Sequence, residues 1–363
     1  MHDLIVIGAG PAGSSTAITA AQNGARVLLL ERGRFPRHKV CGEFVSAESI
    51  GLLRELLGPS GSDILHGAVR IAQARVFMDH HVLPAPVQPA AASIARVGLD
   101  YALWHSAGKS GVEAKQQITV RGMTGSGPFA VATSIGQFEA RAVVNASGRW
   151  SNLTVSQPAT SRRKEKWVGL KSHFSEADPS ESVDLYFFDG GYCGVQPISF
   201  SRSGSSRINA CAMVRADVAS TLPEVLDLHP ALRERAAHWR PVMNTITVSP
   251  LFFGTPCPTQ NAAMLVGDAA GFVDPFVGDG ISLALRSGAL AAQCLAPFFA
   301  GTISLPQALE EYSKQYQRRF ASVFRASSRI RRMLRLPRSM RAPLVSFLSN
   351  RPSIAEYFVR NTR

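Results

Sequence analysis

The stretch "DLIVIGAGPAGSSTAITAAQNGARVLLLERG", residues 3–33, decides the fold of this chain. It opens with an apolar run at residues 4–7, which is typical of a parallel strand buried on both faces. Gly8, Gly10 and Gly13 follow in the spacing G-x-G-x-x-G, and a second apolar run ends at Glu31. The order strand, tight turn, helix and strand predicts the opening unit of a dinucleotide-binding domain.

The three glycines have separate roles in such a turn. The first permits the tight turn, the second lets the backbone approach a pyrophosphate, and the third lets the helix pack on the strand. The N–H groups at the start of the helix then face the phosphates. Glu31 stands 18 residues after Gly13, near the offset expected for an acid that binds the ribose hydroxyls. The motif predicts a dinucleotide but does not separate FAD from NAD.

A second strand-to-helix junction lies near the other end of the chain, in "AAMLVGDAAGFVDPFVGDGISLALRSGALAAQCL", residues 262–295. A predicted buried strand ends at Gly267 and Asp268, and Gly278 and Gly280 precede a predicted apolar helix. An aspartate at a strand end can accept hydrogen bonds from a polyol, and a helix N-terminus stabilises negative charge. Two such junctions suit a cofactor longer than a single nucleotide.

The composition is that of a globular protein. The chain has 363 residues, 45% of them hydrophobic and 18% charged, enough for one large or two modest domains. Its five cysteines form no C-x-x-C pair, which indicates neither a disulfide framework nor a zinc site and fits a reducing cytoplasm. We expect no metal site and no signal peptide. No apolar run reaches the roughly 18 residues of a membrane span, so we expect no spanning helix.

Two segments in the middle of the chain bear on the fold. Residues 94–115 predict a helix that begins near Gly98, and residues 116–135 predict two strands. The turn between these strands contains a further partial G-x-G-x-x match at Gly125 and Gly127. Because strand follows strand there, no helix N-terminus is available to bind a phosphate, and we expect no separate NAD(P)H domain.

Short β-like runs dominate residues 166–254 and are separated by turns rich in Gly, Ser and Pro. We expect an antiparallel sheet that holds a substrate. The period of two along a strand places Lys171 and His173 on one face, and Tyr186 and Phe188 together on a face of the next strand. Plain sheet packing is the alternative for each of these residues.

Five motifs in order along residues 3–300 resemble one family. They are G8-A-G-P-A-G13 with Glu31-Arg32, C41-G-E43, R96-x-x-L-D100, G267-D-A-A-G271 and P275-F-V-G-D-G-I281. With them the chain resembles the FAD-dependent oxidoreductases of the geranylgeranyl reductase and aromatic hydroxylase superfamily, which have the p-hydroxybenzoate hydroxylase fold. The resemblance resolves the choice of dinucleotide in favour of FAD.

The resemblance implies a role for each motif. The first motif and Glu31 would hold adenosine and pyrophosphate, Asp268 would bind the ribityl chain, and the amides of Gly280 and Ile281 would face the flavin ring. The implied cofactor-binding residues are Gly8, Gly10, Pro11, Ala12, Gly13, Glu31, Arg32, Cys41, Gly42, Arg96, Gly267, Asp268, Gly278, Gly280 and Ile281. Cys41, Tyr192 and His173 are the candidate catalytic residues, as proton donors or orienting groups.

Cys41 follows three basic residues, Arg37, His38 and Lys39, in "RFPRHKVCGE". These are the cations that the sequence places near the thiol, and a nucleophilic role would require them to lower its pKa. A purely steric role against the flavin ring is the alternative.

The resemblance also implies the domain organisation. We expect an α/β fold with a Rossmann-like FAD-binding domain in three segments, an inserted antiparallel substrate domain and a C-terminal helical tail. The FAD-binding segments are residues 1–70, 94–155 and 256–300, the substrate domain takes strands from residues 71–93 and all of residues 156–255, and the tail is residues 301–363.

The expected activity is that of a flavoenzyme. Reduced flavin, with NAD(P)H as the electron donor, would reduce or hydroxylate a hydrophobic small molecule such as a lipid, isoprenoid or polyketide. The Y-x-W-x-F-P motif of geranylgeranyl reductases has the counterpart Tyr192-Cys-Gly-Val-Gln-Pro197, without its Trp and Phe, and the W-x-W-x-I-P signature of flavin halogenases is missing. The alternative is a flavin-binding redox sensor, associated with a membrane or nucleic acid, without turnover.

The tail carries most of the net charge of +13, with 13 Lys and Arg against three Glu. Tyr312, Tyr316, Phe320 and Phe324 lie four residues apart and predict one apolar helix face. We expect this helix to pack on the body with a solvated basic side. The alternative is a peripheral contact with a membrane or an acidic carrier. We recognise no nucleic-acid-binding fold and expect a cytoplasmic protein, with the inner membrane face as the alternative site.

Overall fold

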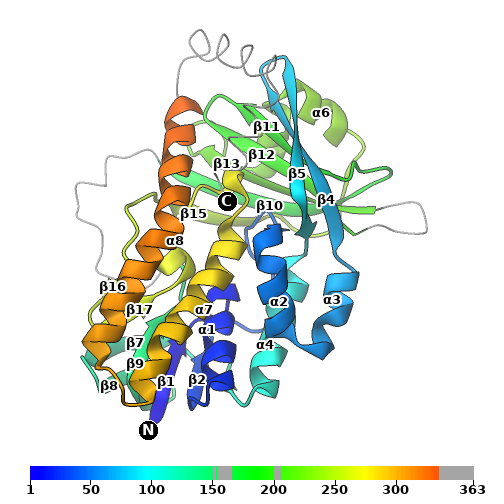
Figure 1. Ribbon diagram of the computed structural model, residues 1–363. Helices are drawn as coiled ribbons and strands as arrows, with labels where there is room; N and C mark the ends of the chain where they lie inside the picture. Colours follow the sequence, from blue (N-terminus) through cyan, green and yellow to red (C-terminus); the bar gives the residue numbers. More distant parts are fainter. Residues whose placement is uncertain (150–152, 154–165, 200–205, 335–363) are drawn as a thin grey trace.

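The computed structural model describes residues 1–149, 153, 166–199 and 206–334, which form two sheets with helices packed around the first. Figure 1 shows the first sheet below, near the N-terminus, and the second sheet above it. The coarse prediction of an α/β protein is confirmed. The expected crossing between domains near residue 155 lies outside the described residues.

The first sheet has the strand order β16-β17-β9-β1-β2-β6, and a hairpin of β7 and β8 extends it from β9. Its central strands are parallel and apolar because helices or further chain cover both faces. The strands are β1 (His2–Ile7), β2 (Val27–Leu30), β6 (Glu113–Lys115), β7 (Val120–Gly125), β8 (Phe129–Thr133), β9 (Gly136–Asn145), β16 (Thr259–Gln260) and β17 (Ala263–Leu265). The hairpin of β7 and β8 confirms that the second glycine match is a turn between strands.

Helices α1 (Pro11–Gln22) and α7 (Gly280–Phe299) cross closely beside the first sheet (Figure 1). A Cβ atom at Gly288 would lie 2.2 Å from the carbonyl oxygen of Ala12, so glycine is required at the crossing. Ser15 Oγ donates to the carbonyl of Leu285 at 2.7 Å. This contact brings together the two helices that follow the two glycine-rich junctions.

Most of the remaining helices pack around this pair, and two of them, α5 (Leu222–Asp227) and α6 (Pro230–Ala236), cover the second sheet instead. The others are α2 (Ile50–Leu57), α3 (Ser62–His66), α4 (Arg96–Lys109) and α8 (Leu305–Leu334), with short 3-10 turns η1 (Ala47–Ser49), η2 (Pro59–Gly61), η4 (Gly267–Ala269) and η5 (Pro275–Val277). Among the described helices, α7 alone is long and apolar enough to cross a membrane, and 72% of its most apolar window is buried inside the protein. It is therefore a core helix of this fold.

Helix α8 packs its predicted apolar face on the body of the protein. Tyr312, Tyr316, Phe320 and Phe324 are buried in the main core, and Tyr312 Oη donates to the carbonyl of Leu265 in β17 at 2.7 Å. This confirms the predicted packing. The basic residues Arg335, Arg338 and Arg341 of the expected tail lie outside the described residues.

The second sheet has the order β14-β10-β13-β12-β11-β4-β5-β3, with β15 beside β10, and it is antiparallel apart from the β4–β11 pair. Strands from residues 69–93 thus lie in one sheet with strands from residues 167–251. The strands are β3 (Phe44–Val45), β4 (Val69–Met78), β5 (His81–Ser93), β10 (Trp167–Glu176), β11 (Ser182–Phe188), β12 (Gly191–Ser199), β13 (Ser206–Arg215), β14 (Arg240–Pro241) and β15 (Ile246–Leu251).

The two faces of the second sheet have different surroundings. Leu170 and Phe174 of β10, with Tyr186 and Phe188 of β11, belong to a core cluster that also contains residues of α5 and α6. We call this the outer face. The alternate residues, Lys171 and His173 among them, point to the opposite, inner face, toward the first sheet and residues 41–43. The period-two prediction is confirmed for both pairs, and the pairs lie on opposite faces.

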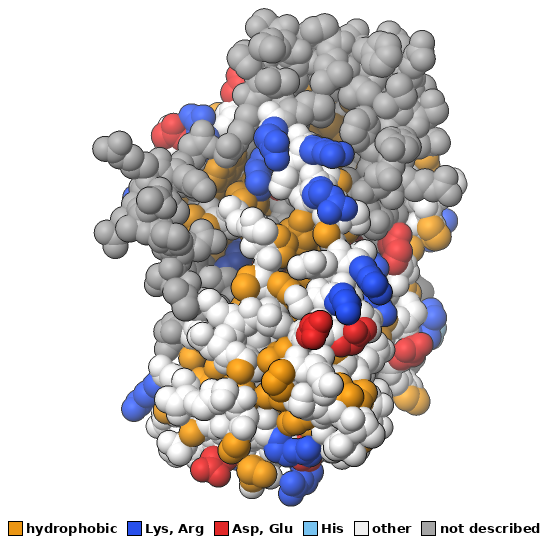
Figure 2. All heavy atoms as spheres, turned by 60° about the vertical axis from the view of Figure 1, so that its left-hand side comes forward, with side chains coloured by type: hydrophobic (Ala, Val, Ile, Leu, Met, Phe, Trp, Pro, Cys, Tyr) orange, Lys and Arg blue, Asp and Glu red, His pale blue; other side chains and the backbone are white. Residues whose placement is uncertain are grey.

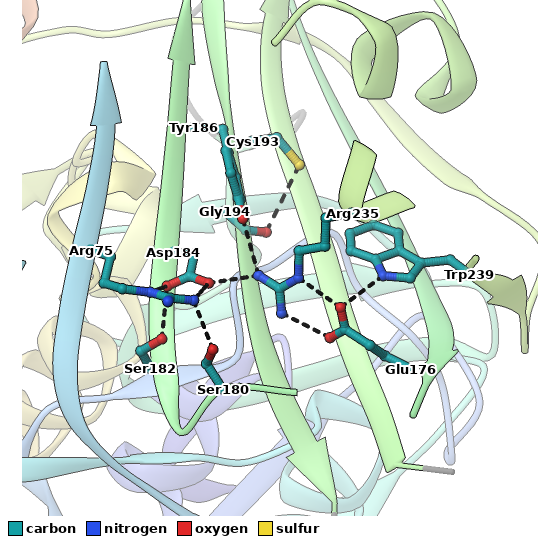
Figure 3. Close-up of polar contacts among 10 residues, drawn as sticks. All are labelled: Arg75, Glu176, Ser180, Ser182, Asp184, Tyr186, Cys193, Gly194, Arg235 and Trp239. Atoms are coloured by element: carbon teal, nitrogen blue, oxygen red, sulfur yellow. Dashed lines mark hydrogen bonds and ion pairs between the residues drawn. The ribbon is translucent and has the colours of Figure 1, made fainter. Parts of the chain in front are cut away.

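The outer face contains a buried ion cluster, which we call the outer cluster: Arg75, Glu176, Asp184 and Arg235 (Figure 3). Arg235 of α6 binds both oxygens of Glu176, at 2.7 and 2.8 Å, and one oxygen of Asp184 at 2.6 Å. Arg75 binds both oxygens of Asp184, at 2.7 and 2.5 Å. Two cations and two carboxylates thus join three strands and a helix.

Candidate active site

A cavity of about 730 Å³ lies between the two sheets and is lined by residues from both. Its volume falls in the usual range for sites of cofactors and small molecules. The carboxyl ends of β1, β9 and β17 open into it, as expected for ligand sites of open parallel sheets.

The first glycine motif forms one end of the cavity. Gly8 has φ +101°, a left-handed conformation, and a Cβ there would lie 2.5 Å from the carbonyl oxygen of Ala146. A Cβ at Gly13 would lie 1.8 Å from the carbonyl oxygen of Gly8. Gly8 and Gly10 line the cavity, with Pro11 and Ala12 beside them, whereas Gly13 lies behind the wall and sets the helix against the strand.

Glu31 and Arg32 line the same end of the cavity. The Glu31 carboxylate is buried and accepts hydrogen bonds from the amides of Ala9, at 2.9 Å, and Gly33, at 2.7 Å. Arg37 Nη2 binds it at 3.0 Å. This fixes the carboxylate at the strand end where the sequence predicts it to meet a ribose.

Arg37 is a cavity residue that the site prediction did not include. Its guanidinium lies over the ring of Phe35, 4.8 Å from the ring centroid, and lines the cavity. Its buried Nε and Nη1 atoms have no hydrogen-bond partner among the described residues. Two unpaired donors beside a dinucleotide motif fit a phosphate or a nucleotide base. In the sequence Arg37 was visible only as one of several bases before Cys41.

The second glycine motif borders the same cavity, beside the first, since a Cβ at Gly267 would lie 2.9 Å from the Ala12 Cβ. Gly267, Asp268, Gly278, Gly280 and Ile281 all line it. A Cβ at Gly280 would meet nothing within 4 Å, so the first turn of α7 is open on that side.

The N-terminus of α7 has no side-chain cap on its own amides. The preceding residue, Asp279, instead accepts a hydrogen bond from Ser46 Oγ at 2.9 Å. Arg149 Nε lies 3.5 Å from Asp268 Oδ2. The Asp268 side chain is still 34% exposed, and the residue lines the cavity. A helix N-terminus that is uncapped by its own side chain stabilises an electron-rich group placed before it.

Cys41 and Gly42 form the wall of the cavity near this junction. Their carbonyl oxygens accept hydrogen bonds from Asn209 Nδ2 of β13, at 3.0 and 2.9 Å. Arg96 also lines the cavity and is paired with Asp100 through two bonds of 2.6 and 2.8 Å.

Arg96, which is far from Cys41 in the sequence, lies beside the Cys41 thiol. Burial opposes the charge of Arg96, but the charge of Asp100 and a contact with Cys41 raise the pKa of Arg96. Arg37 is instead bound to Glu31, and His38 packs its ring edge-on against His173 at 5.4 Å.

His173 is buried behind the cavity wall and is absent from its described lining. Its Nε2 lies 2.9 Å from Glu43 Oε2, and Lys171 Nζ is bonded to Glu43 Oε1. We call Glu43, Lys171 and His173 the inner cluster. Burial alone would raise the pKa of Glu43, but the hydrogen bond from His173 and the charge of Lys171 outweigh it and hold the pKa below its ordinary value. Direct proton donation from His173 to a ligand in the cavity is not supported by this position.

The remaining half of the cavity lies against the inner face of the second sheet and is apolar. Tyr192 packs between Phe187 and Phe276, with ring centroids 5.5 and 5.9 Å away. Tyr192 is only 5% exposed, and its hydroxyl has no hydrogen-bond partner of good geometry in the described part of the chain. Burial and the nearby Asp274 raise its pKa far above 10, although the backbone of Phe276 partly opposes this. Tyr192 therefore keeps a neutral, buried hydroxyl within the cavity wall.

Comparison with known proteins bears on the identity of this cavity. Residues 3–36 match the family described as FAD dependent oxidoreductase. A digeranylgeranylglycerophospholipid reductase of Methanopyrus kandleri is 26% identical over 89% of this chain and 84% of its own length. A menaquinone reductase of Mycobacterium tuberculosis is 28% identical over 81% of this chain and 76% of its own.

The chain is an FAD-dependent oxidoreductase. Solved structures agree with this on the fold. A geranylgeranyl bacteriochlorophyll reductase-like protein from Thermoplasma acidophilum has a TM-score of 0.76, 21% identity, and coverage of 99% of this oxidoreductase and 95% of that chain. A myxobacterial chondrochloren halogenase has a TM-score of 0.75, 23% identity, and coverage of 89% and 81%. The fold is thus shared by reductases and halogenases.

The residues of the oxidoreductase fit FAD. The open first turn of α7, the unpaired Arg37 nitrogens and the two converging helix N-termini match a long anionic cofactor with an electron-rich ring. When bound, FAD supplies two-electron redox chemistry that no amino-acid side chain provides.

Proposed function

We propose that this oxidoreductase reduces a carbon–carbon double bond of a hydrophobic, isoprenoid-type lipid, with FAD as cofactor and NAD(P)H as the electron donor. The observation that carries the proposal is the apolar half of the cavity, which lies against the second sheet and contains the aromatic trio of Tyr192, Phe187 and Phe276. Two relatives named as reductases of lipid or quinone molecules support it. Hydroxylation of a lipid or polyketide is the rival reaction.

The proposal assigns the expected domains to the two sheets. The FAD-binding segments, residues 1–70, 94–155 and 256–300, would centre on the first sheet, and the substrate segments, residues 71–93 and 156–255, on the second. Within residues 1–70, β3 and the start of β4 belong to the second sheet. The predicted cofactor-binding residues would keep their roles, with Arg37 added next to Glu31.

The shape of the substrate half favours a substrate broader than a single extended chain. Gly194 stands where the geranylgeranyl reductase motif has Trp, and Gln196 stands where it has Phe. Both line the cavity, and Gln196 Nε2 binds Ser93 Oγ at 2.5 Å. The loss of two aromatic rings leaves room beside Tyr192.

The side chains would act by positioning and by excluding water. The amides at Gly280 and Ile281 would stabilise negative charge on the bound ring. The neutral hydroxyl of Tyr192 would donate a hydrogen bond or a proton to the substrate. Cys41 would contact the ring as a small, soft side chain.

The test mixes the FAD-loaded protein with NADPH or NADH and candidate isoprenoid lipids, quinones and polyketides, first without oxygen and then in a parallel sample to which oxygen is admitted. Loss of flavin colour followed by stoichiometric saturation of a lipid, without oxygen uptake, supports the proposal. A product that gains oxygen in step with oxygen uptake assigns hydroxylation instead. Flavin that binds without turnover of any candidate leaves the redox-sensor alternative in place.

We also propose that the basic side of α8 contacts an anionic membrane surface, which would place a cytoplasmic protein at the inner membrane face. Arg318, Arg319, Arg325, Arg329 and Arg332 are exposed on α8. Lys and Arg side chains gather on this side of the molecule beside hydrophobic ones in Figure 2. Ile330, from the same end of the helix, lines the cavity, so a lipid substrate could enter from that surface.

The membrane proposal predicts sedimentation of the protein with anionic vesicles, but not with neutral ones, at low salt. The variant Arg325→Glu/Arg329→Glu should remove this binding. A matched control is Arg26→Glu, because Arg26 is 70% exposed in its side chain and lies away from α8. Equal binding of the two variants, or preference for an acidic carrier protein or DNA over the vesicles, would contradict the proposal.

A further inference from the structure

Residues 41–43 form a loop that is bound from two sides. On the side of the first sheet, Glu43 accepts the amide of Arg96 through Oε1 at 2.7 Å, and its carbonyl oxygen accepts the amide of Ile94 at 2.9 Å. Glu43 has φ +64°, an uncommon conformation for a residue with a side chain, and is fully buried. The loop is therefore attached to the start of α4.

On the side of the second sheet, three side chains bind the same loop. Lys171 Nζ and His173 Nε2 of β10 bind the two carboxylate oxygens of Glu43, the latter at 2.9 Å. Asn209 of β13 binds the carbonyls of Cys41 and Gly42. The free side of the loop is the cavity wall beside the start of α7.

This arrangement costs more free energy than a contact that only joins two sheets would require. Burying an ion pair costs desolvation free energy that apolar residues of similar volume would avoid, and a left-handed glutamate adds backbone strain. A buried charge network does, however, fix orientation more strictly than apolar packing does. The surface that this network orients is the peptide of Cys41 and Gly42, with Arg96 beside it.

We propose that Glu43 is a positioning residue of the flavin site: with Lys171 and His173 it holds the Cys41–Gly42 peptide and the Arg96 backbone against the flavin half of the cavity. Its contribution to FAD binding is then separable from its contribution to folding. The proposal rests on the use of FAD and is independent of which substrate the enzyme reduces.

The test compares Glu43→Gln with the double variant Glu43→Gln/Lys171→Met. The single variant leaves Lys171 buried without its carboxylate, and we expect the melting temperature of the apoprotein to fall by roughly 5 °C or more. The double variant removes both charges, and most of this loss should be recovered. Both variants should bind FAD about tenfold more weakly, with a shifted visible spectrum of the bound flavin, because the loop is no longer held in place.

Glu176→Gln is the matched control. Glu176 lies on the same strand as Lys171, is also largely buried and also pairs with a cation, but it faces the outer cluster. This variant should lower the melting temperature and leave both FAD affinity and flavin spectrum unchanged. A general loss of stability would affect all three variants alike.

A double variant that binds FAD with wild-type affinity and spectrum would overturn the proposal and make the inner cluster purely structural. If the Glu43 variants do not fold, Asn209→Ala provides the second test, since it removes two hydrogen bonds to the loop without unpairing a charge. We expect weaker FAD binding with a fall in melting temperature of a few degrees, similar to that of Glu176→Gln, and unchanged FAD binding would again refute the inference. Failure of the wild-type protein to bind FAD would instead refute the use of the cofactor.

Discussion

Strand β10 has an ion cluster on each of its faces, and the two clusters differ in composition and in what lies next to them. In the outer cluster, every carboxylate oxygen of Glu176 and Asp184 accepts a hydrogen bond from a named donor, and α5 and α6 cover that face. The inner cluster has one carboxylate for two basic side chains and lies directly behind a cavity wall.

The outer face of the second sheet therefore contributes mainly to stability, and the inner face mainly to the site. The outer cluster stabilises the strands and helix that it joins and lies away from the cavity. On the inner face, the cluster binds a loop at the cavity, and the hydroxyl of nearby Tyr192 has no partner of good geometry among the described residues. Unsatisfied buried groups of this kind are tolerated where a ligand completes them.

The largest expected effect is on the outer face. Arg235→Met removes the cation shared by Glu176 and Asp184, and we expect the free energy of unfolding to fall by about 3–5 kcal/mol. Urea denaturation of the FAD-saturated protein measures it. FAD affinity should not change. A decrease in the free energy of unfolding of less than about 1 kcal/mol, or weaker FAD binding, would contradict the assignment of the outer face to stability.

Acidification should lower the stability of the protein through protonation of Glu43 in the inner cluster. The folded-state pKa of Glu43 lies below its ordinary value of 4.5, so protonation favours the unfolded chain. The stability contributed by Glu43 is complete above that ordinary value and is lost as the pH falls through the folded-state pKa. Thermal unfolding between pH 6 and pH 3, roughly the range that brackets the carboxyl titration, measures this loss.

The acid-induced loss should be smaller in the variant Glu43→Gln/Lys171→Met than in the wild type. The charged groups that face Glu43 are Lys171 and His173 of β10, with His38 and Arg96 nearby, and all but Lys171 remain in that variant. An identical loss in both proteins would assign the acid sensitivity to other carboxylates.

Two buried tyrosines on opposite faces give a paired test of intermediate size. Tyr192→Phe on the inner face removes a buried hydroxyl whose hydrogen bond to the backbone of Phe276 is weak, so stability should change by less than about 1 kcal/mol, while kcat/KM should fall about tenfold or more. Tyr186→Phe on the outer face removes the bond of 3.2 Å with Arg235 Nη1 and should cost about 1 kcal/mol of stability without a change in kcat/KM. The reverse pattern would show that the faces have been assigned wrongly.

The smallest expected effect is a change of selectivity. A Cβ at Gly194 would lie 3.3 Å from the end of the flexible Leu185 side chain and 3.7 Å from the carbonyl oxygen of Cys211. Gly194→Ala should therefore leave stability within about 1 kcal/mol and reduce kcat/KM several-fold for broad substrates more than for linear ones. Equal effects on broad and linear lipids would place the substrate away from β12.

Much of the candidate site could be predicted from the sequence because its glycine requirements are local. A strand followed by Gly8, Gly10 and Gly13 has few structural alternatives, and the second junction around Gly280 has the same form. The alternation along β10 also predicted correctly that Lys171 and His173 share a face. It could not indicate which face meets a cavity and which meets α5 and α6, because the pattern is the same for both.

Residues 3–33 and 262–295 by themselves determined an α/β dinucleotide-binding protein with two strand-to-helix junctions, since backbone sterics near a phosphate leave little choice of residue. Only the tertiary structure decided which charges meet. Glu43 and Lys171 are 128 residues apart, and Arg96, which is also distant in the sequence, contacts the Cys41 thiol. Such pairings depend on how two sheets pack against one loop, and side-chain contacts across that distance leave no periodic signal in the chain.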